Sequence, residues 1–143
     1  MKPQLLIGAA TSGSGKTTFT MGLLRALHKR GLRVQPFKCG PDYIDTQFHT
    51  LAADHESVNL DIWMASNTHV QHLYNKYGDG ADVCVTEGVM GLFDGYQRSK
   101  VICTSPELIA AYHVLHRLRE PRHPPCALLY FPYSFAHTCV SAG

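Results

Sequence analysis

The chain has 143 residues, 45% of them hydrophobic, and its 13 basic and 11 acidic side chains give a net charge of +2. This length suits a single domain, residues 1–143, and so small a charge gives no electrostatic case for nucleic acid or an anionic membrane surface. No apolar run approaches the roughly 20 residues of a membrane span and the start of the chain lacks the apolar core of a secretion signal, so we expect a cytoplasmic location.

The first predicted elements are a strand, a loop and a helix. Residues 5–7, Leu-Leu-Ile, are strand-like, and residues 10–17 follow the phosphate-loop pattern G-x-x-x-x-G-K-[ST], with Ala10 in place of the first glycine. Apolar residues then recur at helical spacing up to Leu27, and Lys-Arg-Gly at 29–31 ends the helix. Because this context is the one that a phosphate loop requires, a chance Gly/Ser turn is disfavoured.

A phosphate loop aims backbone N–H groups and a helix N-terminus at an anion. Lys16 can reach the outer phosphates, and the Thr17 hydroxyl can bind a magnesium ion. The sequence therefore predicts a nucleoside triphosphate site formed by Ser12, Gly13, Ser14, Gly15, Lys16, Thr17 and Thr18.

Strands and helices alternate along the rest of the chain. Residues 32–37 read as a second strand, in which Pro36 favours an edge position or a strand end, and residues 40–42 read as a turn. Residues 69–77 predict a helix with Asn67 or Thr68 as its N-cap, and residues 82–86 predict a third strand.

In the tail, residues 106–120 are compatible with a helix and 126–131 with a buried strand. Alternation predicts an α/β fold, a mostly parallel sheet flanked by helices as in P-loop NTPases, with its ligand site at the carboxyl ends of the strands.

Acidic residues follow two of these strands, Asp42 and Asp45 after the second and Glu87 and Asp94 after the third, while Lys38 follows the second strand. Like charges about 4 Å apart repel by roughly 4 kcal/mol at an effective dielectric near 20, so phosphates and carboxylates can share a site only with cations. We predict a magnesium ion held by Thr17, Asp42 and Glu87. The alternative, that these acids only solubilise loops, is preferred for Asp79 and Asp82.

Other candidate metal or redox motifs are weak. The five cysteines lack C-x-x-C spacing and indicate neither a disulfide framework nor a zinc site; Cys84 reads as a small core residue. His69 and His72 are three residues apart, but no third ligand is apparent, so we interpret them as a solvated helix surface.

The chain resembles the N-terminal domain of the cobyrinic acid a,c-diamide synthase family in four runs, at residues 11–18, 33–46, 59–61 and 87–95. The most discriminating motifs are Gly-Pro-Asp-Tyr-Ile-Asp-Thr at 40–46 and Glu-Gly-Val-Met-Gly-Leu-Phe-Asp-Gly at 87–95. The resemblance implies an ATP-dependent carbon–nitrogen ligase. Such an enzyme amidates the a and c carboxylates of cobyrinic or hydrogenobyrinic acid through acyl phosphates, in cobalamin biosynthesis, with ammonia taken from glutamine.

By the same resemblance, the catalytic residues are Lys16, Lys38, Asp45 and Asp94. Lys16 stabilises the β- and γ-phosphates, and Lys38 faces the transferring phosphoryl group or holds the substrate carboxylate. The residues implied to face the corrin or to orient ammonia are Tyr43, Asp45, Thr46 and Asp94.

The resemblance covers residues 1–100, and residues 101–143 read as a divergent tail of a truncated chain, with five of the eight prolines and three of the five cysteines. There is no room for the glutaminase domain that supplies ammonia in this family, so we expect the P-loop fold to be incomplete relative to the family. Whether the chain forms a homodimer stays open.

Three other functions compete with the leading one. A dethiobiotin-synthetase-like ligase uses the same phosphoryl chemistry, but the runs at 40–45 and 87–94 favour the corrin enzyme. A ParA- or MinD-like ATPase carries an additional lysine where this chain has Thr11. An inactive fragment that binds nucleotide weakly is the third alternative.

Overall fold

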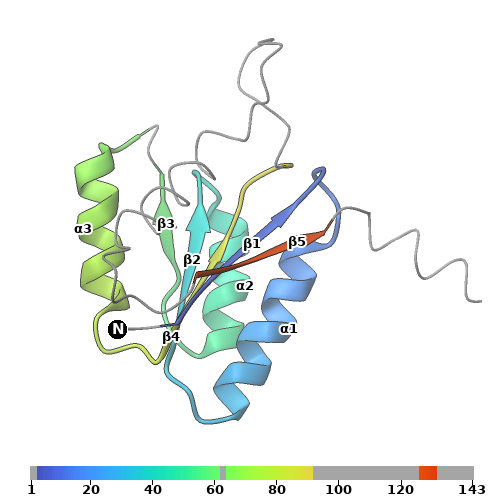
Figure 1. The fold of residues 1–143 in the computed structure, drawn as a ribbon, viewed down its shortest axis with the longest axis vertical. Coiled ribbons are helices and arrows are strands. Elements are labelled where there is room, and N and C mark those ends of the chain that lie inside the picture. The colour runs from blue at the N-terminus through green and yellow to red at the C-terminus, as the bar shows by residue number, and fades with distance from the viewer. Residues whose placement is uncertain (1–2, 62–63, 92–125, 132–143) are drawn as a thin grey trace, which may run out of the picture.

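The computed structural model describes residues 3–61, 64–91 and 126–131. In this part of the chain, strands and helices follow one another along the sequence (Figure 1). Their order is β1 (Gln4–Ala9), α1 (Lys16–Lys29), β2 (Val34–Cys39), α2 (Tyr43–Ala53), β3 (Val58–Leu60), α3 (Asn67–Gly78), β4 (Val83–Glu87) and β5 (Cys126–Phe131).

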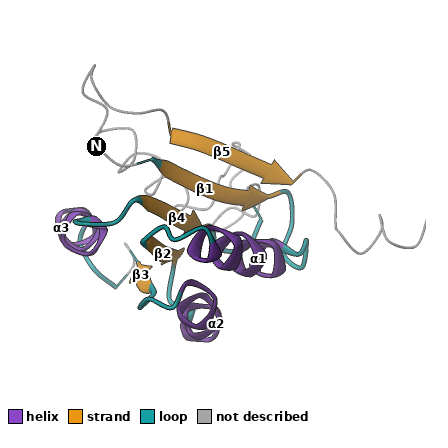
Figure 2. Cartoon of the chain, turned by 90° about the horizontal axis from the view of Figure 1, so that it is seen from below, coloured by secondary structure: helices purple, strands orange, loops and turns teal. Residues whose placement is uncertain are grey.

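The five strands form one sheet in the order β3-β2-β4-β1-β5, and every neighbouring pair is parallel. Figure 2 shows α1 and α2 on one face of the sheet and α3 on the other. This arrangement confirms the predicted α/β fold with a parallel sheet and flanking helices. It also brings the carboxyl ends of β1, β2 and β4 to the same edge, next to the loop before α1.

Each face of the sheet has its own hydrophobic core. Leu6 and Cys84 point toward α3, where the rings of Phe37 and Tyr74 stack with centroids 4.7 Å apart. The next residues along the same strands, such as Ile7, pack against α1 and α2. Because successive side chains alternate between faces, a sheet covered on both sides needs continuous apolar strands. The prediction that Cys84 is a core residue is confirmed, since it is 1% exposed.

The prediction that Pro36 marks a strand edge or end is wrong. Pro36 lies in the middle of β2, and β2 lies between β3 and β4. Pairing with β3 begins only at Phe37, so Pro36 precedes the first residue that has a partner on that side. An interior strand therefore tolerates the missing N–H group where its neighbour is short.

The predicted helix at 69–77 is confirmed as α3, but its cap is not the predicted one. Ser66 is the N-cap, and its hydroxyl accepts a hydrogen bond from the His69 N–H at 3.2 Å. Asn67 and Thr68 are instead the first two residues of the helix. A serine hydroxyl at this place satisfies one of the N–H groups that the first turn leaves without a partner.

Two elements, α2 and β3, have no counterpart among the predicted ones, and α2 is the more consequential. Its apolar side chains lie mostly outside, because Tyr43, Ile44 and Leu51 are 64 to 75% exposed, while Thr46 and His49 are buried. This reversed pattern hides the helical periodicity that sequence reasoning looks for.

The tail contributes β5, which pairs with β1 from end to end and confirms the predicted strand at 126–131 as an extension of the sheet. The predicted helix at 106–120 lies outside the described residues. No helix in the described segments is long and apolar enough to cross a bilayer.

Candidate functional site

The loop between β1 and α1 is held in shape by its own polar groups. The Ser14 hydroxyl donates to the Thr11 carbonyl at 2.6 Å, and the two hydroxyls lie 2.9 Å apart. Gly13 and Gly15 have left-handed backbone angles, φ 73° and φ 84°, which residues with a side chain rarely adopt. Gly15 is also the N-cap of α1, and no side chain caps this helix end in the described segments.

Lys16, the first residue of α1, is folded back over this loop. Its Nζ donates to the Thr11 carbonyl at 3.3 Å, and the residue is only 7% exposed. A cation is therefore held beside the backbone N–H groups of a helix N-terminus. Both features attract an anion, as the sequence predicts for a phosphate.

A second cation, Lys38, lies among three carboxylates. Its side chain is 3% exposed, and its Nζ is 3.0 Å from Asp45 Oδ2, 3.0 Å from Glu87 Oε1 and 3.9 Å from Asp42 Oδ2. It also donates to the Gly88 carbonyl at 3.2 Å. Lys38 and Glu87 meet because they are paired in the β2–β4 register.

Thr17 links the loop to these acids. Its Oγ1 lies 2.9 Å from Glu87 Oε1 and 3.1 Å from Asp45 Oδ2, both within hydrogen-bond distance. The phosphate loop, α2 and the end of β4 thus meet at a single hydroxyl. The two acids beside Thr17 are Asp45 and Glu87, whereas the sequence paired Thr17 with Asp42 and Glu87.

Asp42 has a structural duty as well. It is the N-cap of α2, and its Oδ1 accepts from the N–H groups of Ile44 and Asp45 at 3.1 and 3.0 Å. Its other oxygen faces Lys38. Sequence reasoning places Asp42 at the site, but its role as a cap becomes visible only once α2 is known.

His49 is a site residue that sequence reasoning missed. It lies on α2, is fully buried, and its Nε2 is 2.8 Å from Glu87 Oε2, also fully buried. Asp45 and His49 are four residues apart and therefore share a helix face. That spacing was the one available signal, and it requires knowing that residues 43–53 form a helix.

The charges of this cluster stabilise one another. Burial alone raises the pKa of Glu87, but hydrogen bonds from His49 and Lys38 and the positive charge of Lys38 outweigh it and lower the pKa to about 2. Burial lowers the pKa of Lys38, yet the negative charges of Glu87 and Asp45 leave it above its usual value. For Asp42, burial raises the pKa, but backbone N–H donors and Lys38 leave it below its usual value. At neutral pH all three are ionised.

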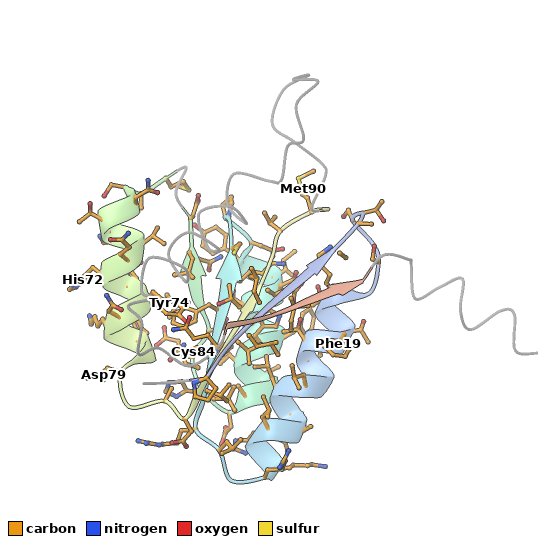
Figure 3. The ribbon with its side chains drawn as sticks, viewed as in Figure 1. Phe19, His72, Tyr74, Asp79, Cys84 and Met90 are labelled. Carbon is orange, nitrogen blue, oxygen red and sulfur yellow. The ribbon has the colours of Figure 1, made fainter. Side chains whose placement is uncertain are left out.

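These groups line one cavity of about 410 Å³ at the carboxyl edge of the sheet, on the side where Figure 3 shows Met90. The predicted site residues around it are Ser12, Gly13, Gly15, Lys16, Thr17, Thr18, Lys38, Asp42, Asp45 and Glu87. The structure thus brings the loop, both lysines and three of the four predicted acids together.

Three of the other predicted site residues, Ser14, Tyr43 and Thr46, do not line this cavity. Ser14 is buried in the loop, and the Thr46 hydroxyl donates to the Tyr43 carbonyl of its own helix at 3.0 Å. Tyr43 is 64% exposed beside the cavity rather than in its lining. Asp94 lies outside the described residues.

The donor set of the cavity suits magnesium. Thr17, Asp42, Asp45 and Glu87 offer only hydroxyl and carboxylate oxygens, which are the ligands that Mg²⁺ prefers. We find no ready-made metal site of three or more acidic, histidine or cysteine side chains over residues 3–61, 64–91 and 126–131. His69 and His72 are both exposed, as expected for a solvated helix surface.

A second cavity, of about 400 Å³, lies at the opposite edge of the sheet, where Figure 3 shows Asp79. It is lined by the segments before β2 and β4 and by the ends of the three helices. Ligands of open parallel sheets bind at the carboxyl ends of the strands, so the cavity beside the phosphate loop is the better candidate.

Comparison with known proteins gives matches over much of the chain. A family model described as "CobQ/CobB/MinD/ParA nucleotide binding domain" matches residues 5–123. A cobyrinate a,c-diamide synthase of Listeria monocytogenes serotype 4b (strain F2365) is 55% identical over 93 residues, 64% of this chain and 21% of the relative. The enzyme of that name from Picrophilus torridus is 51% identical over 96 residues, 67% of this chain and 22% of the relative.

A hydrogenobyrinate a,c-diamide synthase of Rhodobacter capsulatus is 57% identical over 91 residues, 64% of this chain and 21% of the relative. The chain thus spans about a fifth of the length of the curated relatives it matches. These matches confirm the family resemblance found in the sequence.

Among solved structures, the signal recognition particle receptor FtsY from Elizabethkingia anophelis in complex with GDP has a TM-score of 0.55 and 18% identity, covering 91% of this chain and 40% of that one. At this identity the likeness concerns the fold, and it confirms the P-loop NTPase-like architecture.

Proposed function

Because the chain belongs to the CobQ/CobB/MinD/ParA nucleotide-binding domain family, we propose that it is the ATP-binding part of a cobyrinate or hydrogenobyrinate a,c-diamide synthase of cobalamin biosynthesis. The observation that carries the proposal is the meeting of Lys38, Thr17 and Glu87, from β2, α1 and β4, in the cavity beside the phosphate loop. The proposal includes ATP and Mg²⁺, a cytoplasmic location and ammonia supplied by a glutaminase domain.

The chemistry follows from the poor reactivity of a carboxylate, whose leaving group would be oxide. A corrin carboxylate oxygen attacks the γ-phosphorus of ATP, the bond to the β-phosphate oxygen breaks, and ADP leaves with that electron pair. Ammonia then attacks the carbonyl carbon of the acyl phosphate. The carbon–oxygen bond breaks, inorganic phosphate leaves, and a proton is lost from nitrogen to give the amide. Positioning and charge neutralisation do most of this work.

Each predicted residue has a place in this scheme. Lys16 and the loop N–H groups bind the β- and γ-phosphates, and Lys38 faces the transferring phosphoryl group or the substrate carboxylate. Thr17, Asp42 and Glu87 hold Mg²⁺, which supplies positive charge at the phosphates, and Asp45 lies close enough to share this task. Tyr43, Thr46 and Asp94 are proposed to face the corrin or to orient ammonia.

The proposal is tested by supplying ammonium in place of the glutaminase. The chain is incubated with cobyrinic acid labelled with ¹⁸O in its carboxylates, together with ATP, Mg²⁺ and ammonium chloride, and the products are measured by mass spectrometry. We expect ATP-dependent amides, and one ¹⁸O atom transferred to inorganic phosphate for each amide formed. A reaction mixture with a non-hydrolysable ATP analogue is the control.

Amide formed without label in phosphate would contradict the acyl-phosphate route. ATP binding without any amide would contradict catalysis by this chain and favour the alternative of a nucleotide-binding fragment.

A further inference from the structure

The carboxylate of Glu87 uses its two oxygens for different purposes. Oε1 faces the cavity, 3.0 Å from Lys38 Nζ and 2.9 Å from Thr17 Oγ1. Oε2 points the other way, 2.8 Å from His49 Nε2. A carboxylate oxygen accepts hydrogen bonds, so the N–H group of His49 Nε2 is the donor in this second contact.

The other nitrogen of the His49 imidazole makes no comparable contact in the described segments. This nitrogen, Nδ1, is buried and has no hydrogen-bond partner in the described segments, and the residue is fully buried. Burying an unpaired polar nitrogen costs free energy, so packing alone would be better served by an apolar side chain. The contact with Glu87 is the interaction that offsets this cost.

The position of His49 is fixed by α2. Asp42 caps this helix, Asp45 lies in its first turn beside Lys38 and Thr17, and His49 follows Asp45 at four residues on the same face. The same helix therefore places the Asp45 carboxylate beside Lys38 and Thr17 and the His49 imidazole against Oε2 of Glu87.

We propose that His49 is a positioning residue: by holding Oε2, it keeps the carboxylate of Glu87 turned so that Oε1 faces Thr17 and Lys38. The inference rests on the proposed function, in which Glu87 and Thr17 hold the magnesium ion that accompanies ATP. It assigns to His49 an effect on magnesium dependence, exerted through Glu87 and not through contact with the ion.

The test measures ATP affinity by calorimetry, once with Mg²⁺ and once with EDTA, for the parent chain and for His49→Leu and His49→Gln. The Gln amide nitrogen is the same number of bonds from Cα as His Nε2, so it can restore the donor, whereas Leu cannot. We expect His49→Leu to reduce the Mg²⁺-dependent gain in affinity about tenfold, as is usual when a group behind a metal ligand is removed. The affinity in EDTA should stay near that of the parent, and His49→Gln should recover most of the gain.

His55→Leu is the matched control, because the His55 ring contacts Gln35, away from the cavity. Should His49→Leu fail to fold, His49→Asn takes its place, since its shorter amide cannot reach Glu87 as Gln can. A folded Leu or Asn variant with the magnesium gain of the parent would overturn the role of His49 alone. A parent chain that binds ATP with no magnesium effect would instead contradict the proposed function.

Discussion

Replacing Lys16 with alanine is expected to weaken ATP binding about 10- to 100-fold, because a hydrogen bond between charged groups contributes roughly 1.5–3 kcal/mol. Lys16 lies at the amino end of α1, is 7% exposed and reaches the loop at Thr11. Its cation is the group best placed to neutralise the outer phosphates. Calorimetric titration with ATP and Mg²⁺ measures the loss.

Lys29→Ala is the control for this variant, because Lys29 is an exposed cation at the other end of the same helix. It changes the net charge by the same amount but should leave the affinity unchanged. Equal affinities of the Lys16→Ala variant and the parent for ATP would contradict the prediction that the phosphate loop binds ATP.

Replacing Lys38 with methionine is expected to lower the free energy of unfolding by about 3–5 kcal/mol, the usual cost of breaking a buried ion pair from one side. The reason is that Glu87 is fully buried and depends on Lys38 and His49 to remain ionised. Urea unfolding of the parent and the variant measures the difference.

Two controls separate this effect from the loss of any lysine. Arg33→Met removes a cation that is 72% exposed and pairs with Asp82 at the surface, so it should cost much less. Adding Glu87→Gln to Lys38→Met should restore part of the stability, since it removes the uncompensated charge. If the double variant is less stable than Lys38→Met, the charge of Glu87 is not the cause of the loss.

The Lys38→Met effect should also depend on pH in a defined direction. The pKa of Glu87 is lowered to about 2 in the folded protein, so its ionised form contributes stability above its ordinary pKa, and this contribution is lost as the pH falls toward 2. The stability difference between parent and variant should therefore shrink from about pH 5 downward, because protonation removes the charge that Lys38 neutralises.

Local sequence patterns were enough to predict the phosphate loop and the acid at the end of β4. The glycines and Lys16 of the loop are enough to predict a phosphate site, and the apolar run before Glu87 predicts the position of this acid at the end of β4. The order of the motifs along the chain predicts the parallel sheet. Each of these features depends on residues that are close together in sequence.

The contacts that α2 makes with the site, through Asp45 and His49, could not be predicted, because they depend on how this helix is rotated about its axis. The buried face of this helix carries Thr46 and His49, while Ile44 and Leu51 face outward, so the apolar pattern points the wrong way. The same rotation decides that Asp45, and not Asp42, lies against the Thr17 hydroxyl. Such choices follow from tertiary packing and not from spacing.

The most direct test of a single site for ATP and magnesium is paramagnetic line broadening by Mn²⁺ in place of Mg²⁺. With saturating ATP, we predict strong broadening of the backbone amide resonances of Thr17, Asp45 and Glu87, and little at His28 and Gly80, which line the opposite cavity. Broadening centred on His28 and Gly80, or equal at both edges of the sheet, would contradict the account.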